Sequence, residues 1–210
     1  FGVVIFPGSN CELDDLYSVE KVLLQKAIPL WHKEEELPPV DCIILPGGFS
    51  YGDYLRPGAI ASRSPIMNSI KAFAARGGIV IGICNGFQVL TETGLLPGAL
   101  KRNEGLHFIS RHHHLKIVSN DNAFLQHCHV GDVVNIPIAH HDGNYYIDAE
   151  GLKELYANDQ VLLQYTDSEG NIDNPNGSVG SIAGICNKTK NVFGLMPHPE
   201  RAMESLPGSD

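Results

Sequence analysis

The run from Gly77 to Gly94, GGIVIGICNGFQVLTETG, constrains this chain more than any other segment. Its first half, Ile79 to Ile83, is short, apolar and rich in β-branched residues, which predicts a strand buried on both faces. Phe87 to Glu92 has the pattern of a short helix. Between them, Gly82-Ile-Cys-Asn-Gly86 has the G-x-C-x-G spacing of a sharp strand-to-helix turn. The segment therefore predicts Cys84 on a tight turn at a helix N-terminus.

A thiol in that place is a candidate nucleophile. The dipole and the free N–H groups of a helix N-terminus favour the thiolate form. The alternative is a buried, inert cysteine between two glycines that serve only packing. A general base elsewhere in the chain, placed to take the thiol proton, would favour the nucleophile over the inert cysteine.

Composition limits the possible partners. The 210 residues, 43% hydrophobic and 19% charged, suit a single α/β domain over 1–210. A net charge of -9 argues against binding nucleic acid or an anionic membrane, so we expect small molecules or proteins. No apolar run approaches the ~20 residues of a membrane span, and the chain opens on a strand-like FGVVIF without a charged leader. Five cysteines without a C-x-x-C pair suit a reducing cytoplasm.

The first half of the chain reads as repeated strand-loop-helix units. After a first strand over 1–6, we expect a helix over 12–27, capped by Ser9 or Asn10. Its inner face is predicted to carry leucines and one alanine: Leu13, Leu16, Leu23, Leu24 and Ala27. A possible short strand over 29–32, a buried strand over 42–45 and a helix over 66–76 follow.

A long glycine-rich loop, PGGFSYGDYLRPGA over 46–59, follows the 42–45 strand. Such loops commonly bind ligands. Repeated units of this kind imply a mainly parallel open sheet wrapped by helices, with ligands at the carboxyl ends of its strands. The loops PGSNC, PGGFSYGD and CNG are therefore expected to converge on one edge.

Beyond Gly98 the pattern changes to shorter strands over 107–109, 115–118, 133–138, 161–165, 181–186 and 192–196, with a helix over 149–158. Asn187 to Asn191 is a plausible hairpin turn between the last two strands. The second half is thus expected to add antiparallel strands to the sheet.

A base and its orienter are predicted in Met196-Pro-His-Pro-Glu200. In an extended segment, residues two apart point the same way, so His198 and Glu200 can hydrogen-bond. A nucleophilic thiol needs such a pair. The alternative is a surface histidine beside an unrelated glutamate.

The remaining histidines and cysteines are weaker candidates. The pairs at His127/His129 and His140/His141 lack the spacing of a metal framework, so no metal is expected. Cys11 is the rival nucleophile, because it also follows a strand, but its loop lacks the G-x-C-x-G pattern.

These motifs carry a family resemblance that spans nearly the whole chain. FPGSNC, ILPGGFSYGDYLRPGAIA, GICNGFQVLTETGLLPGAL, NPNGS and GLMPHPERAME together resemble the class I, triad-type glutamine amidotransferases, in particular the branch that serves the fourth step of purine biosynthesis. The resemblance implies an open, flavodoxin-like sheet. It also implies a start methionine and a few residues before Phe1. Where the family tends to show His-Gly-Glu-Gly, this chain has His140-His-Asp-Gly143.

The resemblance also implies roles for particular residues. Cys84, His198 and Glu200 would be the catalytic triad that hydrolyses glutamine through a thioester. The backbone N–H groups of Gly48 and Asn85 would form the oxyanion hole. Substrate-binding roles would fall to Gly47, Phe49 and Gln88.

Ammonia would then pass to a larger synthetase subunit, with a small third subunit as a possible further partner. ATP and magnesium are expected on that synthetase and no cofactor in this chain, which has no G-x-x-x-x-G-K-[ST] loop. Two other interpretations stay open: a stand-alone cysteine hydrolase or deglycase of similar fold, and a non-catalytic regulatory module.

Overall fold

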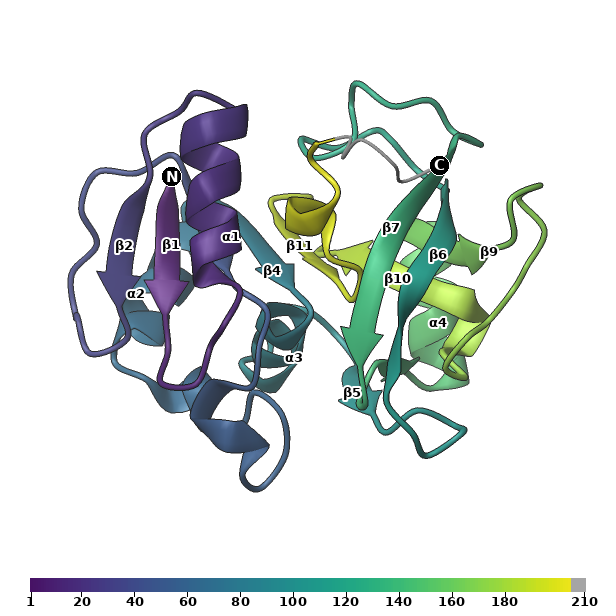
Figure 1. The fold of residues 1–210 in the computed structure, drawn as a ribbon, viewed down its shortest axis with the longest axis horizontal. Coiled ribbons are helices and arrows are strands. Elements are labelled where there is room, and N and C mark those ends of the chain that lie inside the picture. The colour runs from purple at the N-terminus through teal and green to yellow at the C-terminus, as the bar shows by residue number, and fades with distance from the viewer. Residues whose placement is uncertain (205–210) are drawn as a thin grey trace.

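A nine-stranded mixed sheet runs through the molecule, in the order β2-β1-β3-β4-β11-β10-β9-β6-β7 (Figure 1). The computed structural model describes residues 1–204. The strands of this sheet are β1 (Gly2–Ile5), β2 (Ile28–Trp31), β3 (Cys42–Leu45), β4 (Ile79–Ile83), β6 (Ile109–Ile117), β7 (Val133–His140), β9 (Val161–Thr166), β10 (Ile182–Cys186) and β11 (Val192–Leu195). Two further strands, β5 (Ala99–Lys101) and β8 (Asn144–Tyr146), pair separately. The α-helices are α1 (Glu12–Tyr17), α2 (Ile66–Ala75), α3 (Asn85–Glu92) and α4 (Ala149–Ala157).

The parallel part of the sheet comprises β2, β1, β3, β4 and β11. The apolar runs of β3 and β11 are buried along their whole length, as expected for strands covered on both faces. Figure 1 shows α1 on the near side of this part and α2 on the far side. The predicted convergence of loops is confirmed, because Ser9 bridges to Gly48, and the Ser50 N–H donates to the Asn85 side chain at 3.2 Å.

The second half is antiparallel, as predicted. Strand β11 joins the two halves, since it pairs parallel with β4 and antiparallel with β10. The expected strands over 107–109 and 115–118 are a single strand, β6, which pairs continuously with β7. The polar run His112 to His114 concealed this continuity, because β6 lies near the edge of the sheet, where one face tolerates polar side chains. Strands β5 and β8 were not predicted.

The first helix differs from its prediction in length, cap and orientation. It continues from α1 into a π-helical turn, Ser18–Val22, and ends there instead of at Ala27. Its N-cap residue is Cys11, without a side-chain capping bond. The predicted inner face is right only in part: Leu16 and Ala27 pack against the core, whereas Leu13, Leu23 and Leu24 are exposed. The buried positions of the helix are Asp15, Ser18 and Val19, because this side contacts both β1 and the polar segment after His198.

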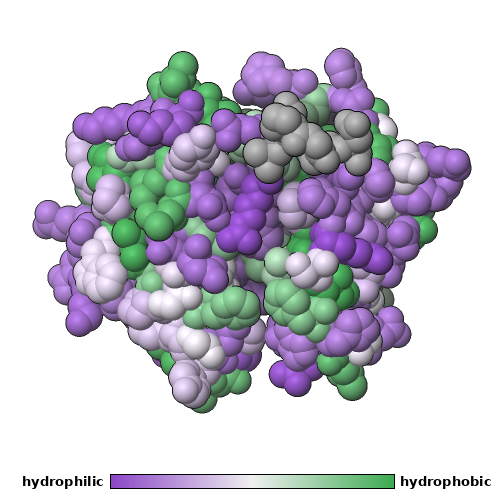
Figure 2. All heavy atoms as spheres, in the orientation of Figure 1, coloured by the Kyte–Doolittle hydropathy of each residue, from purple (hydrophilic) through white to green (hydrophobic). Residues whose placement is uncertain are grey.

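The outer surface mixes polar and apolar residues. In the space-filling view, hydrophilic residues gather near the middle, between the two halves, and apolar residues form small groups (Figure 2). None of the helices within residues 1–204 combines the length and the apolar character needed to cross a membrane.

Candidate active site

Cys84 stands on the turn between β4 and α3, in a conformation rarely adopted by residues with a side chain (φ 49°, ψ -102°). Its N–H donates to the Leu195 carbonyl at 2.8 Å, which ties the turn to β11. A side chain on Gly86 would overlap the Leu45 carbonyl oxygen of β3, and one on Gly82 would meet Leu90. Both glycines are therefore required for the helix to start so close to the sheet, as the G-x-C-x-G pattern predicts.

His198 and Glu200 form a buried pair just after β11. The Nδ1 atom of His198 lies 2.6 Å from Oε1 of Glu200, and both side chains are almost fully buried. Glu200 lies in a 3₁₀ turn, Pro199–Arg201, and not in the extended segment that the sequence suggested. The His198–Glu200 pair still forms, because the turn between the two residues is short. The His198 backbone is also fixed, since its N–H donates to the Pro137 carbonyl of β7 at 2.9 Å.

Cys84 and His198, the predicted nucleophile and base, lie close together. The Cys84 thiol donates to the Ala139 carbonyl at 3.7 Å, and Nε2 of His198 is buried without a partner among residues 1–204. Burial lowers the pKa of His198, but the sulfurs of Cys84 and Cys11 and the Glu200 carboxylate more than offset this and raise it well above its ordinary value. An imidazolium beside Cys84 is therefore favoured once the thiol ionises.

Cys11 lies on the other side of the same imidazole. Its Sγ is 4.0 Å from Nδ1 of His198, the nitrogen that Glu200 already engages, and it accepts a bond from Arg201 at 3.2 Å. Burial raises the pKa of the Cys11 thiol, against the opposing effect of His198. Cys11 is thus a neutral packing partner of the base, less suited than Cys84 to attack a substrate.

Within residues 1–204, Cys11, His198 and Glu200 are the one group with metal-binding atoms all within 4.8 Å of one another. Ligands of a tetrahedral zinc ion would stand roughly 3.3 Å apart. The Nδ1 and Oε1 atoms are closer than that, at 2.6 Å, and the Arg201 guanidinium points at the sulfur. The arrangement is that of a hydrogen-bonded cluster.

The glycine-rich loop after β3 lies against the triad. Gly47 packs on His198, since a Cβ there would stand 2.7 Å from Cε1 of the ring. Gly48 has φ +129°, a value that a residue with a side chain adopts only under strain. Within the described part of the chain, the N–H groups of Gly48 and Asn85 have no hydrogen-bond acceptor. Two unpaired donors therefore flank the Cys84 turn.

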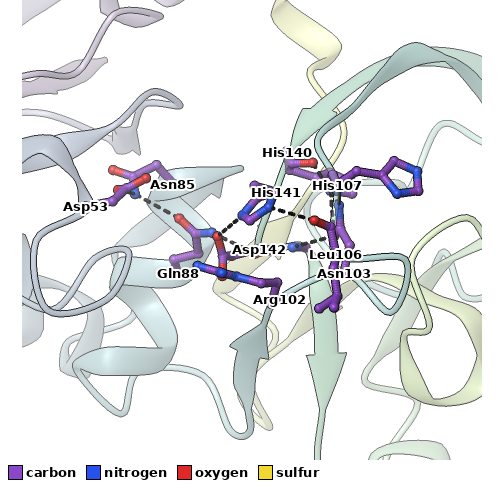
Figure 3. A network of polar contacts seen from close by, with 11 residues as sticks. Asp53, Asn85, Gln88, Arg102, Asn103, Leu106, His107, His140, His141 and Asp142 are labelled. Atoms are coloured by element: carbon purple, nitrogen blue, oxygen red, sulfur yellow. Dashed lines mark hydrogen bonds and ion pairs between the residues drawn. The ribbon is translucent and has the colours of Figure 1, made fainter.

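Gln88 and Asn85 link the strand-to-helix turn that carries Cys84, called the elbow from here on, to the loop after β7 (Figure 3). The Asn85 side chain donates to Gln88 Oε1 at 2.8 Å, and Gln88 Nε2 donates to the Asp142 carbonyl at 2.8 Å. Both side chains are buried, so the loop is held in place by a chain of amides. Phe49, in contrast, is 46% exposed beside the site.

A second polar cluster centres on His140 and was not predicted from the sequence (Figure 3). Its Nδ1 lies 3.2 Å from Asn103 Oδ1, and its Nε2 lies 3.5 Å from Asn176 Nδ2. Burial, and then the charge of His198, lower the pKa of His140 to about 4. The sequence signal for this cluster was the Asn-Pro-Asn-Gly stretch that contains Asn176. Asparagine side chains in such a loop commonly hydrogen-bond to buried polar groups, as Asn176 does here.

The strained cysteine turn and the buried His-Glu pair at the carboxyl ends of parallel strands define a cysteine-nucleophile enzyme of the glutamine amidotransferase class. The CobB/CobQ-like glutamine amidotransferase domain model matches residues 2–209, so the chain belongs to that family.

Two curated relatives of this chain share one description. The chain is 64% identical over 209 residues to phosphoribosylformylglycinamidine synthase subunit PurQ of Sulfurimonas denitrificans, covering 99% of this chain and 93% of that protein. It is 50% identical to the subunit of the same name from Aquifex aeolicus, covering 100% of this chain and 93% of that protein. The solved structure of PurLQS from Thermotoga maritima matches with a TM-score of 0.84 and 43% identity, covering 97% of this chain and 89% of that one. A glutamine amidotransferase from the same organism, 15% identical with a TM-score of 0.60, shares the fold.

Proposed function

We propose that this chain is the glutaminase subunit of a phosphoribosylformylglycinamidine synthase and supplies ammonia for purine biosynthesis. The observation that carries the proposal is the strained Cys84 turn beside the 2.6 Å His198–Glu200 pair. The 64% identity to a PurQ subunit over nearly the whole chain supports the choice among glutamine amidotransferases.

In this reaction Cys84 Sγ attacks the side-chain amide carbon of glutamine. The thiol proton passes to Nε2 of His198, which has no other partner among residues 1–204, and from there to the departing amine, so that ammonia leaves and a γ-glutamyl thioester remains. A water molecule then gives its proton to the same nitrogen and attacks the thioester. The C–S bond breaks, glutamate is released, and His198 returns the proton to the Cys84 sulfur. Glu200 holds Nδ1–H throughout and so fixes the tautomer of the base.

The oxyanion of each tetrahedral intermediate is stabilised by the N–H groups of Gly48 and Asn85. Both donors are unpaired within the described chain. Gly48 lies in the loop after β3, and Asn85 is the residue after Cys84. A preorganised donor of this kind contributes about 3 kcal/mol to transition-state stabilisation. Asn85 is held in place by its bonds to Ser50 and Gln88.

Glutamine binds beside the elbow against Gly47, Phe49 and Gln88. Gly47 leaves room next to the imidazole, and the half-exposed Phe49 ring forms an apolar wall. Gln88 already bonds Asn85 and Asp142, so it acts chiefly by fixing the loop that closes the site.

The partners are a larger synthetase subunit, which holds ATP and magnesium, and a small third subunit. The solved PurLQS structure from Thermotoga maritima supports both, since its name joins PurL and PurS to PurQ. The five free cysteines suit a cytoplasmic protein.

The test is Cys84→Ala in the reconstituted synthase. Glutamine-dependent synthesis should fall by more than ~10³-fold, because the residual rate lacks covalent catalysis, while ammonia-dependent synthesis should stay near wild type. Cys128→Ala, at a half-buried cysteine away from the site, is the matched control. Retention of glutamine-dependent synthesis by Cys84→Ala would overturn the proposal.

A further inference from the structure

Asp15 is a buried carboxyl group that the reaction described above does not use. It lies in α1 with 1% of its surface exposed, and its Oδ2 has no hydrogen-bond partner among residues 1–204. A buried carboxylate without a partner is costly, whereas the protonated acid can donate a hydrogen bond. The role of Asp15 therefore depends on which hydrogen-bond acceptor lies next to its carboxyl group.

The first helix turns Asp15 towards the triad. Residues 11, 15 and 18 share one side of a helix. Cys11 Sγ lies 4.0 Å from Nδ1 of His198, and Ser18 Oγ donates to the Glu200 carbonyl at 3.2 Å. Asp15 stands between these two contacts, so its side chain faces the segment that holds Glu200.

Glu200 has an unsatisfied oxygen of its own. Its Oε1 accepts the bond from His198, but its Oε2 is buried and has no partner within the described residues. Two carboxyl groups on facing elements thus each carry one unpaired oxygen. A single proton between them satisfies both, as in other paired carboxyl groups.

We propose that Asp15 is held as a neutral acid and donates its O–H to Oε2 of Glu200, which makes it a positioning residue of the triad. The inference rests on the proposed function, because Glu200 acts through His198. The hydrogen bond fixes the plane of the Glu200 carboxylate, so that Oε1 stays aligned on Nδ1 of His198 during turnover. No proton is transferred between Asp15 and Glu200 in the reaction.

Ionisation of Asp15 would remove this bond. Burial, followed by the Glu200 carboxylate, raises the pKa of Asp15 to about 8, against the opposing charge of His198. The charged or titratable groups around it on α1 and on the Pro199–Arg201 turn are Cys11, Glu12, Asp14, His198, Glu200 and Arg201. Above pH 8 two adjacent carboxylates would repel each other and displace Glu200, and glutaminase activity should fall.

The experiment compares Asp15→Asn with Asp15→Ala in the reconstituted synthase, with glutaminase kcat and KM measured from pH 6 to 10. The side-chain amide of the Asp15→Asn variant keeps a donor but does not titrate, so kcat at pH 7 should stay within about threefold of wild type and the activity loss near pH 8 should disappear. Asp15→Ala leaves Oε2 unpaired, and kcat should fall roughly tenfold with little change in KM for glutamine. Asp121→Asn, which removes an exposed carboxylate paired with Lys190 and not among the groups around Asp15, is the matched control and should keep the wild-type pH profile.

Two results would overturn the inference: a wild-type alkaline limb in Asp15→Asn, or a wild-type kcat in a folded Asp15→Ala. If Asp15→Ala does not fold, the pH profile of Asp15→Asn still decides. An inactive wild-type synthase with glutamine would instead refute the proposed function, so the two failures are distinguishable.

Discussion

At the scale of single residues, Cys84 adopts a backbone conformation that costs about 1–3 kcal/mol for a residue with a side chain. The surrounding structure enforces it, through the Leu195 carbonyl on one side and the crowded Gly86 on the other. Reactivity at this position therefore depends on packing as well as on the thiol itself.

His140 gives a prediction about acid stability. It is buried as a neutral ring, since its Nε2 faces the Asn176 amide donor, and its pKa is lowered to about 4. The unfolded chain binds the proton more readily, so the stability from this group is complete above pH 6.5 and is lost as the pH falls towards 4. We expect the free energy of unfolding to drop by about 3 kcal/mol over that window from this residue alone.

Urea unfolding of wild type and His140→Gln at pH 7 and pH 4 measures the effect. The variant should lose less stability over this interval, by roughly that amount, whatever its stability at pH 7. The exposed His127→Gln serves as control and should follow the wild type. Equal losses in His140→Gln and wild type would contradict the prediction.

At the scale of elements, the placement of α3 against β3 determines whether the site exists. Helix α3 starts directly after the nucleophile, and Gly86 in its first turn approaches the last residue of β3 so closely that no Cβ fits. The same contact brings Asn85 beside Ser50 of the glycine-rich loop. The Cys84 turn and the proposed oxyanion donors are thus positioned by one helix-strand contact.

Gly86→Ala should therefore destabilise the fold by about 3 kcal/mol through overpacking and should also abolish glutamine hydrolysis. Gly94→Ala is the comparison, because a Cβ there meets nothing within 4 Å and only its φ of +75° is strained, at about 1 kcal/mol. Thermal unfolding with a glutaminase assay tests both. Equal stability of the two variants would show that the close approach is unimportant.

At the scale of the whole molecule, the predicted triad residues Cys84, His198 and Glu200 are brought together from distant segments of the chain. The Cys84 thiol bonds the Ala139 carbonyl, and Nε2 of His198 has no partner in the described chain. Proton transfer from the thiol to His198 requires Cys84 to exchange the Ala139 carbonyl for Nε2. Exposed apolar side chains near the site, Phe49, Tyr54 and Leu55, offer a surface through which a partner could drive this exchange.

We expect the free subunit to hydrolyse glutamine slowly and the assembled synthase to raise kcat at least ~10-fold, because base catalysis requires an engaged Cys-His pair. Steady-state glutaminase assays with and without the synthetase subunit measure this. The rate of Cys84 alkylation by iodoacetamide, followed in both states, reports the thiolate directly. Partner-independent turnover at the full rate would contradict the expectation.

Several local features can be predicted from the residues alone: the strand over 79–83, the glycine spacing around Cys84, and the His-Pro-Glu order after the last strand. These follow from short-range sterics and periodicity, so the residues alone specify them. The sequence also indicated the parallel first half and the antiparallel second half, because strand spacing and hairpin turns are local signals.

The buried face of the first helix, in contrast, depends on contacts between distant segments of the chain. Leu13 and Leu24 are exposed and Asp15 is buried, because the buried side of the helix packs on the polar segment that holds Glu200 as well as on the core. The same holds for His140, whose partners come from Asn103 and Asn176, far away in the chain. Around Cys84, local sterics specify the turn, whereas the charge and hydrogen bonds of its catalytic partners arise from contacts between distant segments.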